Sequence, residues 1–275
     1  MKRTLMTDAN TSSEGMITVR ELACVEAGVV SGSLVDAATV DGLAEKLGMD
    51  RSAARRAVWL AGARPEPAAA IILIGGESVR MGTDKAFIVL DGMSAAARLY
   101  KKLAPYFDEV FFAAGTSQAS PVAGARCVYD TVAGQGPLAG LAAGISASPY
   151  RANFVIACDI PEINLPLMRK LLSYLELYEI AVPAFSRRKI EPLFGAYNRA
   201  VGATAKRLLD GGSLKVISVF AHHRTRIVAA ADKGWYANLN TPDDLRRYLK
   251  SREKKEPENE AAEHDGPPSG QELPE

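Results

Sequence analysis

The sequence contains few cysteines, few histidines and no long hydrophobic run, and each scarcity excludes a class of protein. The three cysteines, at positions 24, 127 and 158, form no CxxC pair, which argues against a disulfide framework and indicates a reducing compartment. The three histidines show neither metal-ligand spacing nor a neighbouring candidate nucleophile, so nothing supports a zinc site or histidine general-base catalysis. No stretch is long and apolar enough for a membrane span or a signal-peptide core, and we therefore expect a cytoplasmic protein.

The chain also lacks an excess of charge of either sign. Lys and Arg number 33 and Asp and Glu number 32, which argues against nonspecific nucleic-acid binding by the chain as a whole. With 275 residues, of which 48% are hydrophobic, the chain can bury a full core. This length predicts one sizeable domain with a smaller addition.

The most informative segment reads AAAIILIGGESVRMGTDKAFIVL. Its continuous apolar run over residues 70–74 predicts a buried central strand of a parallel sheet. Gly75 and Gly76 end the run, and glycines at this place let backbone N–H groups approach an anion closely. Arg80 and Lys85 add positive charge beside those amides. The spacing matches neither a Walker A loop nor a GxGxxG dinucleotide fingerprint, so we expect a phosphate-holding loop of another kind.

Part of this segment, LIGGESVRMGTDK, resembles the signature LAGGxSxRMGxDK of the molybdenum cofactor guanylyltransferases (MobA), within the wider Rossmann-like nucleotidyltransferase family. The residues that match the signature are Gly75, Gly76, Ser78, Arg80, Met81, Gly82, Asp84 and Lys85. Ile74 stands where the family usually has a small alanine. The resemblance implies an enzyme that transfers GMP from GTP to molybdenum-bound molybdopterin and releases pyrophosphate, with Mg²⁺ as its cofactor. It also implies that Arg80 and Lys85 act in catalysis, and that Lys85 also binds nucleotide.

A second motif follows a later apolar run. Residues 153–157, NFVIA, predict a buried strand, and Asp159 comes just past its carboxyl end, where open α/β sheets bind ligands. A carboxylate there suits Mg²⁺, which takes one or two protein oxygens together with substrate phosphates. The alternative is an aspartate that caps the next helix. The sequence Cys158-Asp159-Ile160-Pro161 resembles the family's CDxP motif, which implies that Asp159 is the metal ligand and a catalytic, nucleotide-binding residue.

The nucleotide side of the site has further candidates. Asp130 ends a strand expected over residues 125–129 and matches a family aspartate that lies on the nucleotide side. Backbone groups of Leu73 to Gly76, together with Asp130, are our candidates for the guanine pocket. Gly115 stands where the family carries a nucleotide-contacting asparagine, so we expect a preference for GTP of roughly tenfold or more, about 1.4 kcal/mol, and not a much larger one.

Near the end of the chain, NLNTPDDL closely resembles the family's NINTPEDL. Helix capping explains Thr241 and Asp243 by itself, because a threonine N-cap, a proline at the first helical position and acids in the first turn all favour a helix start. Capping does not explain Asn238 and Asn240. The resemblance implies that these two asparagines face the pterin side of the site.

The region before the glycine segment has a helical pattern over residues 16–63, after a polar leader over residues 1–15 that we expect to be disordered. Its second half resembles a helix-turn-helix whose second helix carries Arg51, Arg55 and Arg56. Two interpretations remain open: DNA contact through residues 40–62, or an appendage that packs on or interacts with protein.

Beyond this region, strands alternate with helices. The pattern predicts a three-layer α/β domain with a mostly parallel sheet over residues 68–252, a Rossmann-like nucleotidyltransferase fold with a small helical N-terminal extension. The sequence RPEP, residues 64–67, is interpreted as a linker, so a chain without residues 1–66 is expected to fold and to be active. Residues 253–275 are acidic and poor in large apolar residues, and we expect them to be disordered.

The implied partners are GTP and molybdenum-molybdopterin, with transient contact to molybdoenzymes or their chaperones and no membrane. Two other functions remain open. One is cytidylyl transfer to molybdopterin by a related nucleotidyltransferase, although the double glycine favours guanylyl transfer because that relative usually shows AAG. The other is a DNA-binding regulator whose α/β domain senses nucleotide or cofactor.

Overall fold

The structure is a computed structural model that describes residues 29–74, 85–90, 92–115, 119–129, 136–186, 189–230 and 235–263, with the backbone alone for Lys85 and for residues 253–263. Strands that form the main sheet are β1 (Ala68–Leu73), β4 (Glu109–Ala114), β5 (Cys127–Tyr129), β6 (Ala152–Ala157), β7 (Ile180–Ser186), β8 (Lys189–Ile190), β9 (Phe194–Asn198) and β10 (Thr225–Ala229). A separate two-stranded hairpin consists of β2 (Val89–Leu90) and β3 (Met93–Ser94).

The main sheet has the order β10-β7-β9-β6-β1-β4-β5, and the short β8 pairs with β7. The pairs of β1 with β4 and β6, of β4 with β5, and of β7 with β10 are parallel. Only β9, which runs antiparallel to β6 and β7, and β8, antiparallel to β7, depart from this direction within the described residues. The predicted mostly parallel α/β sheet is therefore confirmed.

β1 lies at the centre of the sheet and has both of its faces buried. Ala68, Ala70 and Ile72 belong to one hydrophobic core, whereas Ala69 and Ile71 belong to a second core on the opposite face. This alternation follows from the two-residue period of a strand. It explains why the sequence shows a continuous apolar run here instead of alternating apolar and polar residues.

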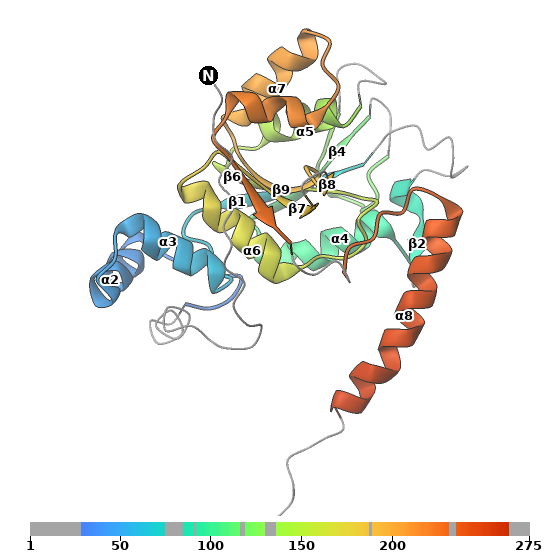
Figure 1. Ribbon diagram of the computed structural model, residues 1–275, viewed down its shortest axis with the longest axis horizontal. Coiled ribbons are helices and arrows are strands. Elements are labelled where there is room, and N and C mark those ends of the chain that lie inside the picture. The colour runs from blue at the N-terminus through green and yellow to red at the C-terminus, as the bar shows by residue number, and fades with distance from the viewer. Residues whose placement is uncertain are drawn as a thin grey trace, which may run out of the picture.

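Helices cover both faces and complete the three layers, as Figure 1 shows. The first core lies beneath α4 (Ala95–Leu103) and α6 (Leu165–Ser173), and the second lies beneath α5 (Gly136–Ala147) and α7 (Val201–Asp210). Short 3₁₀ helices complete the layers: η1 (Lys85–Phe87), η2 (Ala104–Tyr106), η3 (Tyr174–Glu176) and η4 (Val216–His222).

Two short helices precede the sheet, α2 (Ala37–Leu47) and α3 (Arg51–Leu60). Their ends follow ordinary capping rules: the side chains of Asp36 and Asp50 accept hydrogen bonds from backbone N–H groups three residues later. Gly48, with φ of 59°, ends α2 in the left-handed conformation that glycine tolerates best. The pair is therefore a helical hairpin, as the sequence predicts.

This hairpin packs on the α/β domain through α3, which lies against α6 and η3 (Figure 1). Trp59 is only 2% exposed and forms part of the core beneath α4 and α6. Residues 64–67, interpreted from the sequence as a linker, also contact the domain. Arg64 pairs with Asp108 at 3.3 Å, and Glu66 pairs with Arg151, so the expected linker is bound to the domain at two points.

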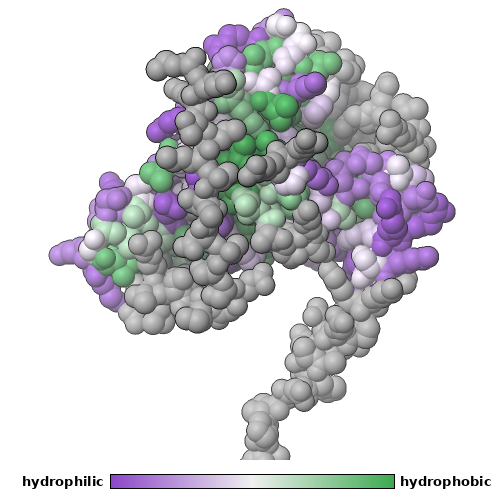
Figure 2. All heavy atoms as spheres, in the orientation of Figure 1, coloured by the Kyte–Doolittle hydropathy of each residue, from purple (hydrophilic) through white to green (hydrophobic). Residues whose placement is uncertain are grey.

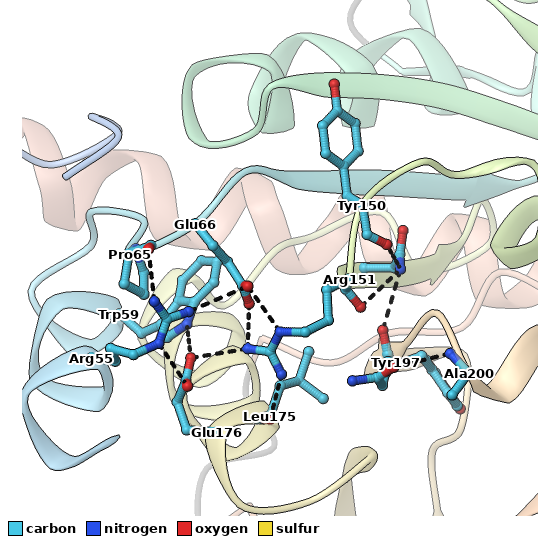
Figure 3. A network of polar contacts seen from close by, with 12 residues as sticks. Arg55, Trp59, Pro65, Glu66, Tyr150, Arg151, Leu175, Glu176, Tyr197 and Ala200 are labelled. Carbon is cyan, nitrogen blue, oxygen red and sulfur yellow. Dashed lines mark hydrogen bonds and ion pairs between the residues drawn. The ribbon is translucent and has the colours of Figure 1, made fainter. Parts of the chain in front are cut away.

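A four-residue ionic network joins the hairpin to the domain (Figure 3). Arg55 from α3 reaches Glu66 and Glu176, with Nε 2.8 Å from Glu176 Oε2. Arg151, just before β6, pairs with the same two carboxylates from the other side. Burial favours the neutral form of Arg151 and would lower its pKa. The hydrogen bonds and negative charges of Glu66 and Glu176 outweigh this effect, so the pKa of Arg151 is raised. In this network, two arginines and two carboxylates therefore neutralise one another at a partly buried place.

These contacts also test the helix-turn-helix interpretation. Arg55 is occupied by Glu66 and Glu176, and the Arg56 guanidinium lies 5.1 Å from the centre of the Tyr174 ring. Of the three arginines predicted to face DNA, only Arg51 is exposed, and it pairs with Asp41. The hairpin uses its second helix against protein, which favours the interpretation as a packing appendage.

The chain ends in a long helix, α8 (Pro242–Glu263), which projects away from the sheet in Figure 1. The helix continues past Arg252, so the disorder expected from residue 253 on is wrong as far as Glu263; residues 264–275 lie outside the described part. Hydrophilic residues cover the part of α8 that is coloured in Figure 2. Within the described residues, no helix combines the length and apolar character that a bilayer span requires.

Candidate active site

The carboxyl ends of β1, β4 and β6 meet at one edge of the sheet. Ile74 N donates to Ala113 O at 2.8 Å, and Cys158 N donates to Leu73 O at 3.0 Å, so the chain just past β1 is bound on both sides. Leu73 and Ile74, predicted to contribute backbone groups to a nucleotide pocket, are 8% and 3% exposed at this edge. Open α/β sheets bind their ligands at such an edge, outside the strand ends.

Asp159 lies at this edge, two residues past the end of β6, and is partly exposed. The position agrees with the predicted role of a carboxylate that meets a ligand, although by itself it assigns no function. The residues described contain no group of three or more His, Cys, Asp or Glu side chains arranged for a metal ion.

Several predicted site residues lie outside the described part of the chain. These are Gly75, Gly76, Arg80 and Asp130, and the side chain of Lys85. Along the chain, Gly75 follows Ile74 directly, and Asp130 comes directly after β5. Their proposed roles in phosphate and nucleotide binding therefore remain predictions.

The two asparagines predicted for the pterin side, Asn238 and Asn240, are brought to Asp159 by the loop before α8. Leu239 N donates to the backbone O of Asp159 at 2.8 Å, and the Leu239 side chain is buried. The Asn240 amide nitrogen donates to Asn238 Oδ1 at 2.7 Å. The hydrogen bond between Leu239 and Asp159 thus places the asparagine loop beside the candidate metal-binding carboxylate, although Asn238 is 79 positions after Asp159 in the sequence.

The start of α8 holds this loop in place. Asp244 N donates to Thr241 Oγ1 at 3.2 Å, while Thr241 N donates to Asp244 Oδ2 at 2.9 Å. This reciprocal pair is a capping box, with Asp244 in the place that glutamate often takes. The Thr241 hydroxyl also donates to Asp244 Oδ2 at 2.8 Å, and this bond is the largest cause that lowers the pKa of Asp244, with smaller contributions from the backbone N–H groups of Thr241 and Asn240 and the charge of Arg247. Capping therefore accounts for Thr241 and leaves the asparagines unexplained, as predicted.

Two residues that the sequence analysis did not select, Glu191 and Tyr236, belong to the same surroundings. The Tyr236 hydroxyl donates to Glu191 Oε2, and Leu193 N donates to Glu191 Oε1 at 3.2 Å. Burial raises the pKa of Glu191, and the nearby charge of Asp159 adds to this increase. Burial and the bond to Glu191 also raise the pKa of Tyr236. Glu191 begins the segment EPLFGAY, which leads from β8 into β9.

Aromatic rings support the Tyr236 side chain. Its ring centre is 4.4 Å from that of Phe185 and 5.7 Å from that of Trp235. The exposed Lys189, on β8, places its Nζ 4.8 Å from the centre of the Tyr236 ring. The basic turn of residues 186–189 therefore contributes at least one cation beside the candidate site, while Arg187 and Arg188 lie outside the described residues.

Known proteins identify the family. The family model described as MobA-like NTP transferase domain matches residues 70–227. The chain belongs to this family. The matched range begins within β1, includes Asp159 and Glu191, and ends before the asparagine loop; residues 29–66 of the hairpin and its connection lie outside it.

Relatives of this MobA-like chain carry consistent names. A probable molybdenum cofactor guanylyltransferase of Pelotomaculum thermopropionicum is 32% identical over 65% of this chain and 90% of the relative. A molybdenum cofactor guanylyltransferase of Burkholderia cenocepacia is 30% identical over 66% of this chain and 97% of the relative. The crystal structure of molybdopterin-guanine dinucleotide biosynthesis protein A from Archaeoglobus fulgidus has a TM-score of 0.58 at 22% identity, and covers 68% of this chain and 99% of that one. This last likeness confirms the fold.

Proposed function

We propose that this protein is a molybdenum cofactor guanylyltransferase, which transfers GMP from GTP to molybdenum-bound molybdopterin and releases pyrophosphate. The observation that carries the proposal is the meeting of three matched motifs at one sheet edge in a MobA-like chain. The strand that leads into the glycine loop, the CDIP segment with Asp159, and the NLNTPDDL loop are joined there by backbone hydrogen bonds. An enzyme of the nucleotidyltransferase class follows from the family and from the names of its relatives.

The proposed reaction needs no side-chain base. A phosphate oxygen of the acceptor attacks the α-phosphorus of GTP, the bond from that phosphorus to the bridging oxygen breaks, and pyrophosphate leaves with the electron pair. Because the attacking group is already an anion, catalysis can rest on alignment and on the neutralisation of charge. Amides of Gly75 and Gly76 would hold the triphosphate, with Asp130 on the nucleotide side, while Arg80 and Lys85 would offset the charge that grows on pyrophosphate.

A divalent cation fits this site, and Mg²⁺ is our proposal for it. Asp159 is the residue that would hold the ion, since its carboxylate is partly exposed at the edge where the phosphates would lie. When bound, Mg²⁺ polarises a phosphoryl oxygen and neutralises charge in the transition state. Asn238 and Asn240 would contact the pterin of the acceptor. We further propose a cytoplasmic location, supported by the reduced state of the two cysteines that the structure describes, Cys127 and Cys158, and transient contact with molybdoenzymes or their chaperones.

The test is pyrophosphate release from GTP, CTP and ATP by the full chain with Mg²⁺ and molybdenum-loaded molybdopterin. We expect GTP to be preferred by about tenfold, since a pocket built for guanine donors and acceptors leaves unpaired buried groups with another base. Asp159→Asn should abolish turnover and leave the melting temperature nearly unchanged. Equal turnover of CTP and GTP would support the cytidylyl alternative. The contacts that Arg55 and Arg56 make with protein count against the regulator alternative.

A further inference from the structure

A line of hydrogen bonds runs from a buried carboxylate to the two asparagines. The Tyr236 hydroxyl donates to Glu191 Oε2, Asn238 Nδ2 donates to the Tyr236 oxygen at 3.4 Å, and Asn240 Nδ2 donates to Asn238 Oδ1 at 2.7 Å. We propose that Glu191 and Tyr236 are positioning residues, which set the orientation of the Asn238 and Asn240 amides for the acceptor. This inference rests on the proposed function for the identity of that acceptor.

The direction of the line follows from the hydrogen bond at its beginning. The Tyr236 hydroxyl has a single proton, and it donates this proton to Glu191 Oε2. The hydroxyl oxygen then has only lone pairs to offer Asn238, which must turn its NH₂ group toward Tyr236. The Asn238 carbonyl oxygen consequently faces Asn240, and Asn240 must present its NH₂ group in turn. The oxygen and the nitrogen of a side-chain amide have nearly the same shape, so shape alone does not fix the orientation of either asparagine. The hydrogen bonds of the line do fix it, because each donor needs an acceptor.

The result is a defined chemical face at the exposed end of the line. Asn240 is exposed and donates through its NH₂ group to Asn238, so its carbonyl oxygen forms the other end of the same amide. A carbonyl oxygen accepts hydrogen bonds, and the ligand that suits it is a heterocycle with N–H donors on its edge. The pterin of the proposed acceptor and the guanine of GTP both have such an edge, and the resemblance of the NLNTPDDL loop assigns these asparagines to the pterin.

The beginning of the line is held firmly by the sheet. Glu191 Oε1 accepts from Leu193 N at 3.2 Å, and Leu193 O accepts from Ala157 N, at the end of β6, at 2.9 Å. The Tyr236 ring is held by Phe185, 4.4 Å away between ring centres. The orientation therefore originates in the rigid part of the fold and is transmitted to a surface loop, as expected for a support of a binding site.

The test compares two tyrosines in the full-length protein. Tyr236→Phe removes the hydroxyl of the line and keeps the ring that packs on Phe185. Tyr197→Phe is the matched control, because the Tyr197 hydroxyl is likewise buried and donates to Pro192 O at 2.6 Å, but takes no part in the line. Glu191→Gln is a third variant that keeps the shape of the side chain and replaces one acceptor oxygen with a donor NH₂ group.

Two readouts separate positioning from stability. The first is the side-chain amide signals of Asn238 and Asn240 in ¹H–¹⁵N spectra, which we expect to move in Tyr236→Phe and in Glu191→Gln, and to stay in place in Tyr197→Phe. The second is the KM for molybdopterin, expected to rise about tenfold in the first two variants while the KM for GTP changes less than about twofold, the loss expected for roughly one hydrogen bond.

The outcomes distinguish this inference from the proposed function. Unmoved Asn240 amide signals in Tyr236→Phe would overturn the inference, whether or not the wild-type protein transfers GMP. Equal effects of Tyr236→Phe and Tyr197→Phe on the molybdopterin KM would also overturn it, since both would then act through stability. A third outcome is that the amide signals move in the variants while the wild-type protein releases no pyrophosphate from any nucleotide. This outcome would confirm the positioning and reject guanylyl transfer.

Discussion

Arg55 Nε lies 2.8 Å from Glu176 Oε2, although 121 positions separate the two residues in the sequence. The Glu176 side chain is 7% exposed and that of Arg55 is 20% exposed, so water screens this pair poorly. Trp59, one turn further along α3, also donates to Glu176, from Nε1 to Oε1 at 3.3 Å. The contact therefore connects the N-terminal hairpin to the α/β domain through an ion pair in which each charge compensates the burial of the other.

Arg55→Ala should lower the free energy of unfolding by about 3 kcal/mol, because it removes a positive charge that pairs with the largely buried carboxylates of Glu66 and Glu176. Arg51→Ala is the matched control on the same helix. Its pair with Asp41 is 58% exposed on both sides, so we expect a change below about 0.5 kcal/mol. Urea denaturation of both variants measures the difference, and an equal loss in the two would contradict a stabilising role for the network.

Removal of residues 1–66 should destabilise the α/β domain, which corrects the expectation of an undisturbed truncated enzyme. The truncation takes away Trp59 from the core, the Glu66 partner of Arg151 and the Arg55 partner of Glu176. We expect the melting temperature to fall by about 10 °C, from a loss of about 3 kcal/mol or more. A truncation of residues 1–28 is the control, since the contacts of Trp59, Arg55 and Glu66 survive it. A melting temperature that is the same for the two truncated chains would show that the hairpin contributes nothing.

Acid should weaken the attachment of α8 through Glu162. Burial favours the neutral form of this carboxyl, but hydrogen bonds from Lys102 and Tyr248 outweigh burial, and its pKa is lowered. A lowered pKa gives stability that is present above the unfolded pKa, about 4.3, and is lost as the pH falls through the folded pKa. The difference in melting temperature between the wild type and Glu162→Gln should therefore shrink from pH 7 to pH 3. For Glu45→Gln, at an exposed position of α2, no such trend is expected.

Gly115→Asn should sharpen the choice of nucleotide without a cost in stability. Among the residues that the structure describes, nothing lies within 4 Å of a Cβ atom at Gly115, so the first atom of a side chain can be accommodated there. We expect the ratio of kcat/KM for GTP to that for CTP to rise by up to about tenfold, the equivalent of about 1.4 kcal/mol. Gly115→Ala, which adds the Cβ without the amide, should leave the ratio where it is. A ratio unchanged in Gly115→Asn would mean that this position does not touch the base.

Local patterns in the sequence determined much of this protein. The continuous apolar runs over residues 70–74 and 153–157 predict buried parallel strands, because a strand covered on both faces has no polar face to show. The glycine signature, together with Asp159 after the strand expected over residues 153–157, predicts the family and the sheet edge where its ligands bind. These features can be read from the sequence because each depends on residues within a few positions of one another.

Only the tertiary structure decided which distant residues meet. The RPEP segment has the composition of a linker, but Glu66 and Arg64 find charged partners on the domain, which composition cannot reveal. Glu191 was not selected because no local pattern connects it to Tyr236, 45 positions later. The pairing arises because β9 runs back beside β6 and the loop before α8 returns to Asp159, so that the path of the chain, and not its spacing, brings these side chains together.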